Sequence, residues 1–319
     1  MEILTEVLSA EKRIRPYILH TPLEFSPSLS EWLQAEVWLK MEHIQTTGSF
    51  KLRGAANRLL SLKASQVEKG IITASTGNHG AAVAYMAHRL GIDCTIYLPE
   101  NVSPTKVAFM KSYGASMEYY GMDSVESEIK AREVAKSQKK LFVSPYNDPM
   151  VVAGQGTLGF EVLRDLEDVE GIFVPVGGGG LISGVAGYLK HIRDEIKVVG
   201  CQPANSAVMY KSLKAGKVLD LPSEETWSDG TAGGLETDSM TFEMCQQYVD
   251  EWNVVSEEEI ERALLYMLEH HYLLVEGAAA LALSSLLQNR QKWVGKKVVL
   301  VLCGRKMSMK GLRKLLGKS

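Results

Sequence analysis

The sequence contains few cysteines, no long apolar run and no large excess of charge of either sign. Its four cysteines lie far apart and form no CxxC pair, which excludes a disulfide scaffold and predicts buried thiols in a reducing compartment. Charges at Glu2, Glu6 and Glu11 interrupt the N-terminal segment and no apolar run reaches about 18 residues, so we expect neither a signal peptide nor a membrane span. The 35 basic and 38 acidic residues give a net charge of −3, which offers no attraction for nucleic acid or an anionic membrane. We therefore expect a cytoplasmic protein.

Glycine, by contrast, is abundant, at 28 of 319 residues against a background of roughly 7%. The length suits about two domains, and the sequence has no internal repeat or low-complexity linker. Short apolar runs that end in Gly or Pro alternate with segments of helical period, which predicts an α/β fold with parallel sheets. Five runs carry this prediction: GIITAS from Gly70, CTIYLP from Cys94, GIFVPV from Gly171, VVGCQP from Val198 and VVLVLC from Val298.

The spacing of these runs predicts two domains. Residues 70 to 143 hold a self-contained alternation of strands and helices, which predicts a small α/β domain inserted at 66–147. Residues 1–65 and 148–319 would then form one larger, discontinuous domain. Ligands of α/β proteins bind in clefts between such lobes, so we expect the functional site there.

The strongest local signal is the segment VPVGGGGLISG, in which a buried strand leads through Gly177–Gly180 into a helix. Four consecutive glycines leave backbone N–H groups uncovered at a helix N-terminus, where they favour a phosphate. The segment matches neither the dinucleotide fingerprint nor the Walker A loop. The structural alternative is a tight turn, which needs only one or two glycines.

A second motif, TTGSFKLRGAANRLL, places Lys51 at the start of a helix between Phe50 and Leu52. A lysine held in low dielectric has a lowered pKa and becomes a nucleophilic amine. Taken alone, the alternative of a solvated lysine at a helix start is the more frequent case.

A third motif, TASTGNHGAAVAY, crowds Ser75, Thr76, Asn78 and His79 where a strand passes into a helix. Hydroxyls, an amide and exposed backbone N–H groups at this place favour a carboxylate, and ordinary helix capping is the structural alternative. No Cys, Asp or second His stands at ligand spacing from His79, so a metal site is not expected there.

Together, a nucleophilic lysine, a phosphate cup and a carboxylate cup are the parts needed to hold pyridoxal phosphate as a Schiff base beside an amino acid. With these motifs the sequence resembles the fold-type-II pyridoxal-phosphate enzymes of the threonine/serine dehydratase and serine racemase group. This resemblance implies a fold like that of the tryptophan synthase β subunit, with two open, twisted, mostly parallel sheets and a cleft between them. It rests on eight ordered motifs that span nearly the whole chain: HTPL at His20, SFKLRGA at Ser49, STGNHG at Ser75, AGQGT at Ala153, GGGGL at Gly177, DGTAGG at Asp229, VEGAAA at Val275 and CGR at Cys303.

The resemblance also implies a role for each matching residue. Lys51 would carry the cofactor and remove the substrate α-proton, and Thr76 stands where racemases of this group have an acid/base serine. The other implied cofactor contacts are Phe50 beside the ring, Asn78 at the 3′-oxygen, Gly177, Gly178, Gly179, Gly180 and Leu181 at the phosphate, Glu276 near the ring, and Cys303 at the pyridine nitrogen. For Glu276 a buried carboxylate bonded to backbone is an equal alternative. The implied contacts to the substrate carboxylate are Ser75, Thr76, Asn78, His79 and Gln155.

A thiol at the pyridine nitrogen holds that nitrogen protonated less well than a carboxylate would, which favours β-elimination over transamination. We therefore expect a dehydratase that converts a β-hydroxy amino acid such as L-threonine or L-serine to a 2-oxo acid and ammonia. The resemblance also implies a homodimer. Where the family has two acidic ligands for a divalent cation, this chain has Gln202 and Val208, so we expect no activating metal.

Four other functions stay open at this point. A racemase is the first alternative, and a β-replacement synthase is another. STGNHG combined with CGR resembles the hydroxyectoine-utilisation dehydratases, which implies a larger or more polar β-hydroxy amino acid. A non-catalytic α/β protein that binds a phosphate ligand would explain the glycines but would leave Lys51 and Asn78 without a purpose.

Overall fold

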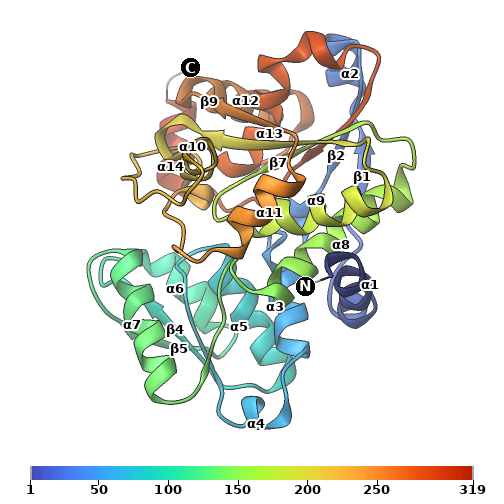
Figure 1. The fold of residues 1–319 in the computed structure, drawn as a ribbon. Coiled ribbons are helices and arrows are strands. Elements are labelled where there is room, and N and C mark those ends of the chain that lie inside the picture. The colour runs from blue at the N-terminus through green and yellow to red at the C-terminus, as the bar shows by residue number, and fades with distance from the viewer. Residues whose placement is uncertain (1, 318–319) are drawn as a thin grey trace.

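The structure, a computed structural model, describes residues 2–317 and contains two separate sheets (Figure 1). The larger sheet has the order β1-β2-β10-β7-β8-β9, and all its pairs are parallel except β1 with β2. The smaller sheet has the order β5-β4-β3-β6 and is parallel throughout. The strands are β1 (Leu23–Phe25), β2 (Glu36–Lys40), β3 (Ile71–Ala74), β4 (Cys94–Leu98), β5 (Ser116–Tyr119), β6 (Leu141–Phe142), β7 (Gly171–Pro175), β8 (Lys197–Pro203), β9 (Glu251–Val255) and β10 (Lys297–Val301).

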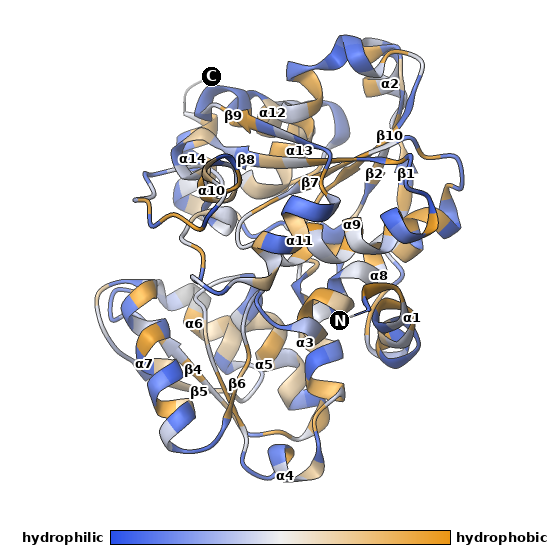
Figure 2. Ribbon diagram, viewed as in Figure 1, coloured by the Kyte–Doolittle hydropathy of each residue, from blue (hydrophilic) through white to orange (hydrophobic). Residues whose placement is uncertain are grey.

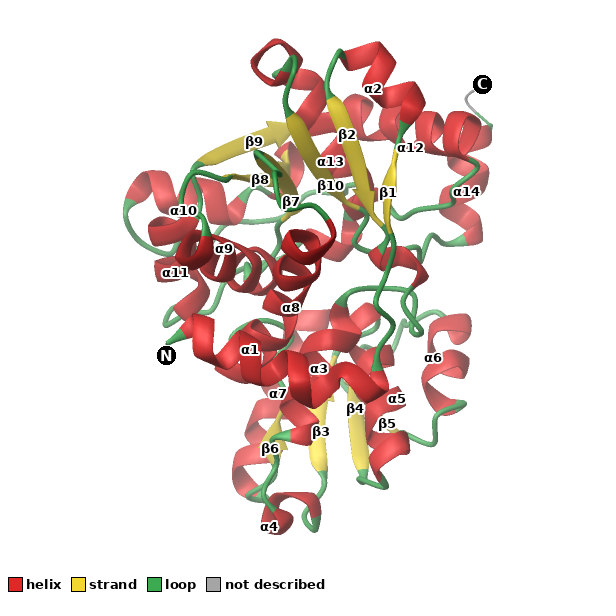
Figure 3. Cartoon of the chain, turned by 90° about the vertical axis from the view of Figure 1, so that its right-hand side faces the viewer, coloured by secondary structure: helices red, strands yellow, loops and turns green. Residues whose placement is uncertain are grey.

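Helices cover both faces of the larger sheet. Seen in Figure 3, α8 and α9 lie in front of this sheet and α13 lies behind it. The helices are α1 (Ile3–Ile14), α2 (Pro27–Leu33), α3 (Lys51–Leu60), α4 (Ala64–Val67), α5 (Asn78–Leu90), α6 (Pro104–Lys111), α7 (Ser124–Ser137), α8 (Pro149–Asp165), α9 (Gly180–Ile192), α10 (Val208–Ala215), α11 (Met240–Tyr248), α12 (Glu257–His271), α13 (Gly277–Gln288) and α14 (Met309–Leu316). Within residues 2–317, no helix combines the length and the apolar composition that crossing a membrane requires.

The predicted fold class is confirmed, because the sheets are two in number and mostly parallel. All five apolar runs form strands, as expected of β-branched segments that are covered on both faces. Surface helices differ from them: α7 alternates hydrophilic and hydrophobic residues along its length (Figure 2). The sequence did not indicate β1, β2 and β9, which lie at or near the two edges of the larger sheet.

Each sheet has its own hydrophobic core, and α3 joins the core of the smaller one. Leu52, Ala55 and Leu59 of α3 are buried in the same cluster as Ile71 and Ile96 of the smaller sheet. The helix that begins at Lys51 therefore packs between the two halves of the molecule. The boundaries of the small domain at 66–147 and of the large domain at 1–65 and 148–319 stay a prediction, and residues 1 and 318–319 of the latter lie outside the described part.

Candidate active site

Lys51 is the first residue of α3 and is half-buried between the two sheets. Its Nζ donates a hydrogen bond to the main-chain oxygen of Pro145 at 2.9 Å and lies 5.2 Å from the centre of the Phe50 ring. Desolvation lowers the pKa of Lys51 to about 8, against the smaller opposing effects of Cys303 and Glu276. With this pKa about a tenth of the amine is unprotonated at pH 7, far more than for a solvated lysine, as a nucleophile or base requires.

The loop before α3 is hydrogen-bonded to the segment that follows β10. The backbone N–H of Phe50 donates to the main-chain oxygen of Cys303 at 3.1 Å. This contact brings together two predicted site residues that lie 253 positions apart in the sequence, Phe50 and Cys303.

The four glycines form the turn between β7 and α9. Gly179 has a φ of 84°, in the left-handed region that favours glycine, and it precedes the first turn of the 13-residue helix α9. A Cβ on Gly178 would lie 2.4 Å from Cδ1 of Tyr146, and one on Gly177 would lie 2.9 Å from the main-chain oxygen of Thr231. Side chains are thus excluded here, and the backbone forms a bare cradle at a helix N-terminus, which we call the glycine cup (residues 177–180).

Leu181 follows the glycine cup and is buried in the core of the larger sheet. Its side chain serves packing, so any contribution to the cup must come from its backbone N–H. This is compatible with the predicted phosphate contact, which stays a prediction.

Gly178→Ala is expected to lower cofactor affinity at least about tenfold, because the new methyl group must displace Tyr146 or distort the glycine cup. Absorbance titration with pyridoxal phosphate measures this effect. Gly234→Ala is the matched control, since a Cβ at Gly234 meets nothing within 4 Å, and its affinity should equal that of the wild type. Equal affinities for all three proteins would contradict the assignment of the cup.

The STGNHG segment joins β3 to α5, as the sequence predicted. Ser75 Oγ accepts a hydrogen bond from the backbone N–H of Gly77 at 3.2 Å, and Thr76 is half-buried next to it. His79 is buried, and its Nε2 lies 3.0 Å from the main-chain oxygen of Val143, to which it must donate. Desolvation and the nearby Lys51 lower the pKa of His79 to about 3, so the imidazole is neutral.

Asn78 and Glu276 meet across the site. Asn78 Nδ2 donates to both carboxylate oxygens of Glu276, at 2.9 and 3.0 Å, while Asn78 Oδ1 is buried without a partner. Glu276 also accepts the backbone N–H of Lys306 at 3.0 Å, and Cys303 Sγ lies 4.0 Å from it. The carboxylate therefore bonds to backbone and also contacts two predicted cofactor residues, and its predicted place near the cofactor ring stays a prediction.

Burial sets the protonation of this group of side chains. It raises the pKa of Glu276, and burial together with Glu276 raises the pKa of Cys303 well above its usual value. The Cys303 thiol consequently keeps its proton at neutral pH. Glu276 also lines a pocket of about 400 Å³ whose wall includes Asp229 and Lys306.

Gln155 lies on α8 and is almost fully buried. Its Oε1 accepts the backbone N–H of Gly54 at 3.1 Å, and a Cβ on Gly54 would lie 2.5 Å from its Nε2. Gln155 therefore joins α8 to α3, three residues beyond Lys51. Its predicted contact with a substrate carboxylate stays a prediction.

Sequence reasoning missed a fully buried group of charges beneath Lys51. Arg53 Nη2 donates to Glu42 at 2.7 Å and to Glu161 at 2.6 Å, and Lys40 Nζ donates to Glu161 at 2.6 Å. All four side chains have no solvent exposure, and Thr157 accepts a further bond from Arg53 at 3.1 Å. Two basic and two acidic groups thus balance one another, which lowers the pKa of Glu161 and raises that of Arg53.

Sequence reasoning also missed Tyr146 and Glu236. Tyr146 packs against Gly178 and Gly180, and its hydroxyl accepts the backbone N–H of Glu236 at 2.8 Å. Nothing in the sequence around either residue distinguishes it from an ordinary loop position.

The family's cation position is occupied by neutral groups. Gln202 Nε2 donates to the main-chain oxygen of Val176 at 3.1 Å, and its Oε1 accepts the backbone N–H of Tyr210 at 2.8 Å. Val208 is buried. Across the described residues, no three His, Cys, Asp or Glu side chains are grouped as metal ligands. The absence of an activating metal stays a prediction.

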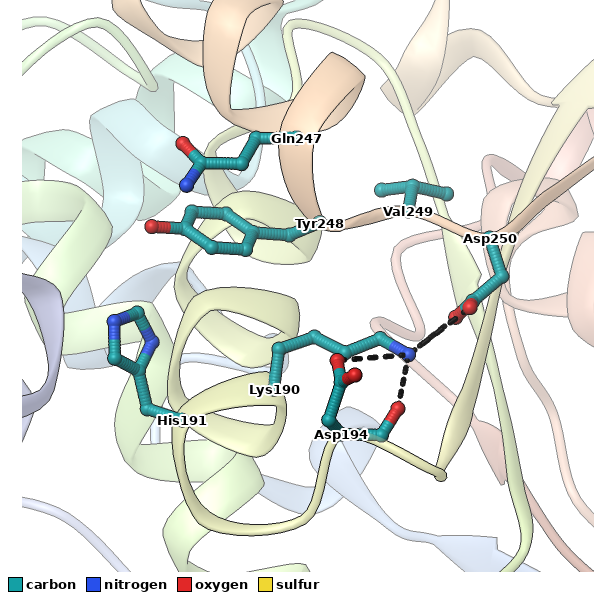
Figure 4. A pocket seen from close by; sticks show the side chains of 7 residues that line it. All are labelled: Lys190, His191, Asp194, Gln247, Tyr248, Val249 and Asp250. Carbon is teal, nitrogen blue, oxygen red and sulfur yellow. Dashed lines mark hydrogen bonds and ion pairs between the residues drawn. The ribbon is translucent and has the colours of Figure 1, made fainter.

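A separate surface pocket of about 340 Å³ lies where α9 and α11 end (Figure 4). There Lys190 lies 2.9 Å from a carboxylate oxygen of Asp250 and donates to the main-chain oxygen of Asp194 at 2.7 Å. Because α9 begins at the glycine cup and Lys190 lies in its last turn, the pocket is roughly 15 Å from the cup. It contains no predicted site residue and is not the candidate site.

The site therefore contains a desolvated lysine, a backbone cradle at a helix N-terminus and a protonated thiol. The chain belongs to the pyridoxal-phosphate-dependent enzyme family, which it matches over residues 14–304. It is 38% identical to the L-threonine ammonia-lyase of Thermotoga maritima over 318 residues, which cover all of this chain and 79% of that protein.

Solved structures give the same picture. Threonine deaminase isoform 2 from Solanum lycopersicum superposes with a TM-score of 0.94 at 31% identity, covering 99% of this chain and 92% of that one. Maize serine racemase superposes with a TM-score of 0.92, also at 31% identity, covering 99% and 97%. The predicted family and the predicted cofactor, pyridoxal phosphate, are thereby confirmed.

Proposed function

We propose that this protein is an ammonia-lyase that uses pyridoxal phosphate to convert a β-hydroxy amino acid of the L-threonine or L-serine type to a 2-oxo acid and ammonia. The observation that carries the proposal is the desolvated Lys51 amine next to the buried Cys303, since the backbone N–H of Phe50 donates to the main-chain oxygen of Cys303. The relative from Thermotoga maritima, named L-threonine ammonia-lyase, supports the choice of reaction and substrate class.

The residues present fit pyridoxal phosphate. The glycine cup is a backbone cradle that any side chain would fill, and it suits the phosphate. Asn78 Oδ1 is buried without a partner, so the Asn78 amide can still accept a hydrogen bond from a ligand donor such as a protonated 3′-oxygen. Lys51 would bond covalently to the cofactor, Asn78 would contact its 3′-oxygen, and Cys303 would face its pyridine nitrogen.

When bound, the cofactor supplies an electron sink that acidifies the α-hydrogen of the amino acid. Lys51 Nζ, with its lowered pKa, accepts that proton. Cys303 Sγ retains its own proton, and a thiol is a weaker acid partner for the pyridine nitrogen than a carboxylic acid, which favours prompt loss of the β-hydroxyl. That hydroxyl would leave as water, with its proton supplied at the glycine cup, whose backbone would hold the cofactor phosphate as the acid. The hydroxyls of Ser75 and Thr76, at the N-terminus of α5, would hold the substrate carboxylate.

A panel of β-hydroxy amino acids tests the proposal, with 2-oxo acid, ammonia and the inverted enantiomer measured in parallel. L-threonine, L-serine and larger, more polar β-hydroxy amino acids belong in the panel. The proposal predicts equal amounts of oxo acid and ammonia from at least one of them. Inversion faster than oxo acid formation would instead support a racemase, for which the Thr76 hydroxyl beside Asn78 is the specific observation.

The same assay tests for an activating cation. Because neutral groups stand at Gln202 and Val208, magnesium or a chelator should change the rate less than about twofold. Stimulation by magnesium that a chelator abolishes would contradict this prediction.

We also propose that the protein is a cytoplasmic homodimer. All four cysteines are free and buried, which supports a reducing compartment, and the dimer rests on the family resemblance. Analytical ultracentrifugation of the holoenzyme measures its mass, and a monomer at micromolar concentration would contradict the dimer.

A further inference from the structure

One acidic side chain connects the two halves of the molecule beside the cofactor site. Glu236 lies in the segment 228–239, which carries the DGTAGG motif and belongs to the half with the larger sheet. Its carboxylate lies 2.7 Å from Nη2 of Arg132 on α7, which covers the smaller sheet. The same carboxylate accepts a hydrogen bond from Asn147 Nδ2 at 3.0 Å.

The segment 228–239 also lies on the glycine cup. The main-chain oxygen of Thr231 would be 2.9 Å from a Cβ on Gly177, and Thr241, just beyond the segment, donates from Oγ1 to the main-chain oxygen of Gly178 at 2.6 Å. Movement of this segment would therefore reach the cup directly.

Tyr146 provides a second connection between Glu236 and the glycine cup. Its hydroxyl accepts the backbone N–H of Glu236 at 2.8 Å, while its ring packs on Gly178. The preceding residue, Pro145, accepts the hydrogen bond of Lys51 Nζ. The residues 145–147 thus contact the lysine, the glycine cup and Glu236 within three consecutive positions.

The Arg132 side chain is also ordered by contacts other than the one with Glu236. It donates to Glu128, one turn earlier on α7, at 2.8 and 2.9 Å, and its guanidinium lies 4.2 Å from the centre of the Phe142 ring. Exposed ion pairs contribute little when two flexible side chains must be ordered. Here the arginine is already ordered, so the pair with Glu236 costs less entropy to form.

We propose that Glu236 is a positioning residue: together with Arg132 it holds the segment 228–239 and Tyr146 against the glycine cup and thereby retains the cofactor phosphate. Glu236 acts through Tyr146 and the cup and does not itself touch the cofactor. This inference goes beyond the proposed function, because it concerns retention of pyridoxal phosphate and holds for any amino-acid substrate.

Loss of pyridoxal phosphate from the holoenzyme during dialysis, followed by the cofactor absorbance band, tests the proposal. Glu236→Gln should release the cofactor about three- to tenfold faster than the wild type, because a charge-assisted bond is replaced by a neutral one. Glu133→Gln is the matched control: it removes a carboxylate of α7 that pairs with Lys130 at 2.9 Å and leaves both Arg132 and Glu236 in place, so its release rate should stay within about twofold of wild type.

Arg132→Met gives a second, independent measurement. It should accelerate cofactor release as Glu236→Gln does, and the double variant should release the cofactor no faster than the faster single variant, because both changes break one contact. High salt should accelerate release from the wild type more than from Glu236→Gln, since the pair is partly exposed. The proposal would be overturned if the double variant accelerated release by the product of the two single effects, or if Glu236→Gln and Glu133→Gln released the cofactor at equal rates.

Discussion

Replacing Lys51 with alanine is expected to reduce turnover of β-hydroxy amino acids by at least about 10³-fold, since both the covalent anchor of the cofactor and the base are removed. Desolvation of Lys51, which lowers its pKa to about 8, is the physical reason that this lysine can serve as a base. The rate of 2-oxo acid formation with saturating pyridoxal phosphate measures the effect.

Two further variants separate the amine's chemistry from its charge. Lys51→Arg keeps a positive charge but stays protonated, so it should be as inactive as the alanine variant. Lys69→Ala removes an exposed lysine and should leave the rate unchanged. A Lys51→Ala enzyme that turned over substrate at the wild-type rate would refute the proposed mechanism.

The second large effect concerns stability. Arg53→Met should lower the free energy of unfolding by about 3–5 kcal/mol, because it leaves the buried carboxylates of Glu42 and Glu161 short of a compensating charge. Urea unfolding followed by circular dichroism measures the change. Arg53 lies two residues beyond Lys51 on α3 and bonds to Glu161 on α8. Its loss should therefore also weaken the packing of α3 against α8.

Arg193→Met provides the control for this prediction. Arg193 pairs with Glu195 at 2.9 Å, but 34% of the arginine side chain and 68% of the glutamate side chain are exposed, and pairs so open to solvent contribute little. A free energy of unfolding for Arg53→Met within about 1 kcal/mol of wild type would show that the buried charges do not hold α3 in place.

The site motifs could be predicted because each is local. The glycine cup, Lys51 and the STGNHG segment each combine a strand or helix boundary with the residues that do the chemistry, so a few consecutive positions suffice to indicate them. The capping box of α12 is local in the same sense, because Ser256 Oγ accepts the backbone N–H of Glu259, three residues further on, at 3.3 Å.

The features that sequence reasoning missed depend on partners far along the chain. Lys40 is the last residue of β2, and its charge is compensated by Glu161, which lies 121 positions away. Because a charged side chain is not expected in a buried strand, the sequence did not indicate β2. Arg132 and Glu236 are 104 positions apart. Only the three-dimensional structure brings such pairs together, because neither member is unusual in its own segment.

The central claim is that pyridoxal phosphate is bonded to Lys51 in the cleft beside the glycine cup. Reduction of the holoenzyme with borohydride, followed by peptide mass spectrometry, tests it most directly, because reduction fixes the cofactor to the lysine that carries it. The structure predicts the added mass on the peptide that contains Lys51 and on no other. Cofactor on a different lysine, or a protein that carries none after incubation with pyridoxal phosphate, would contradict the claim.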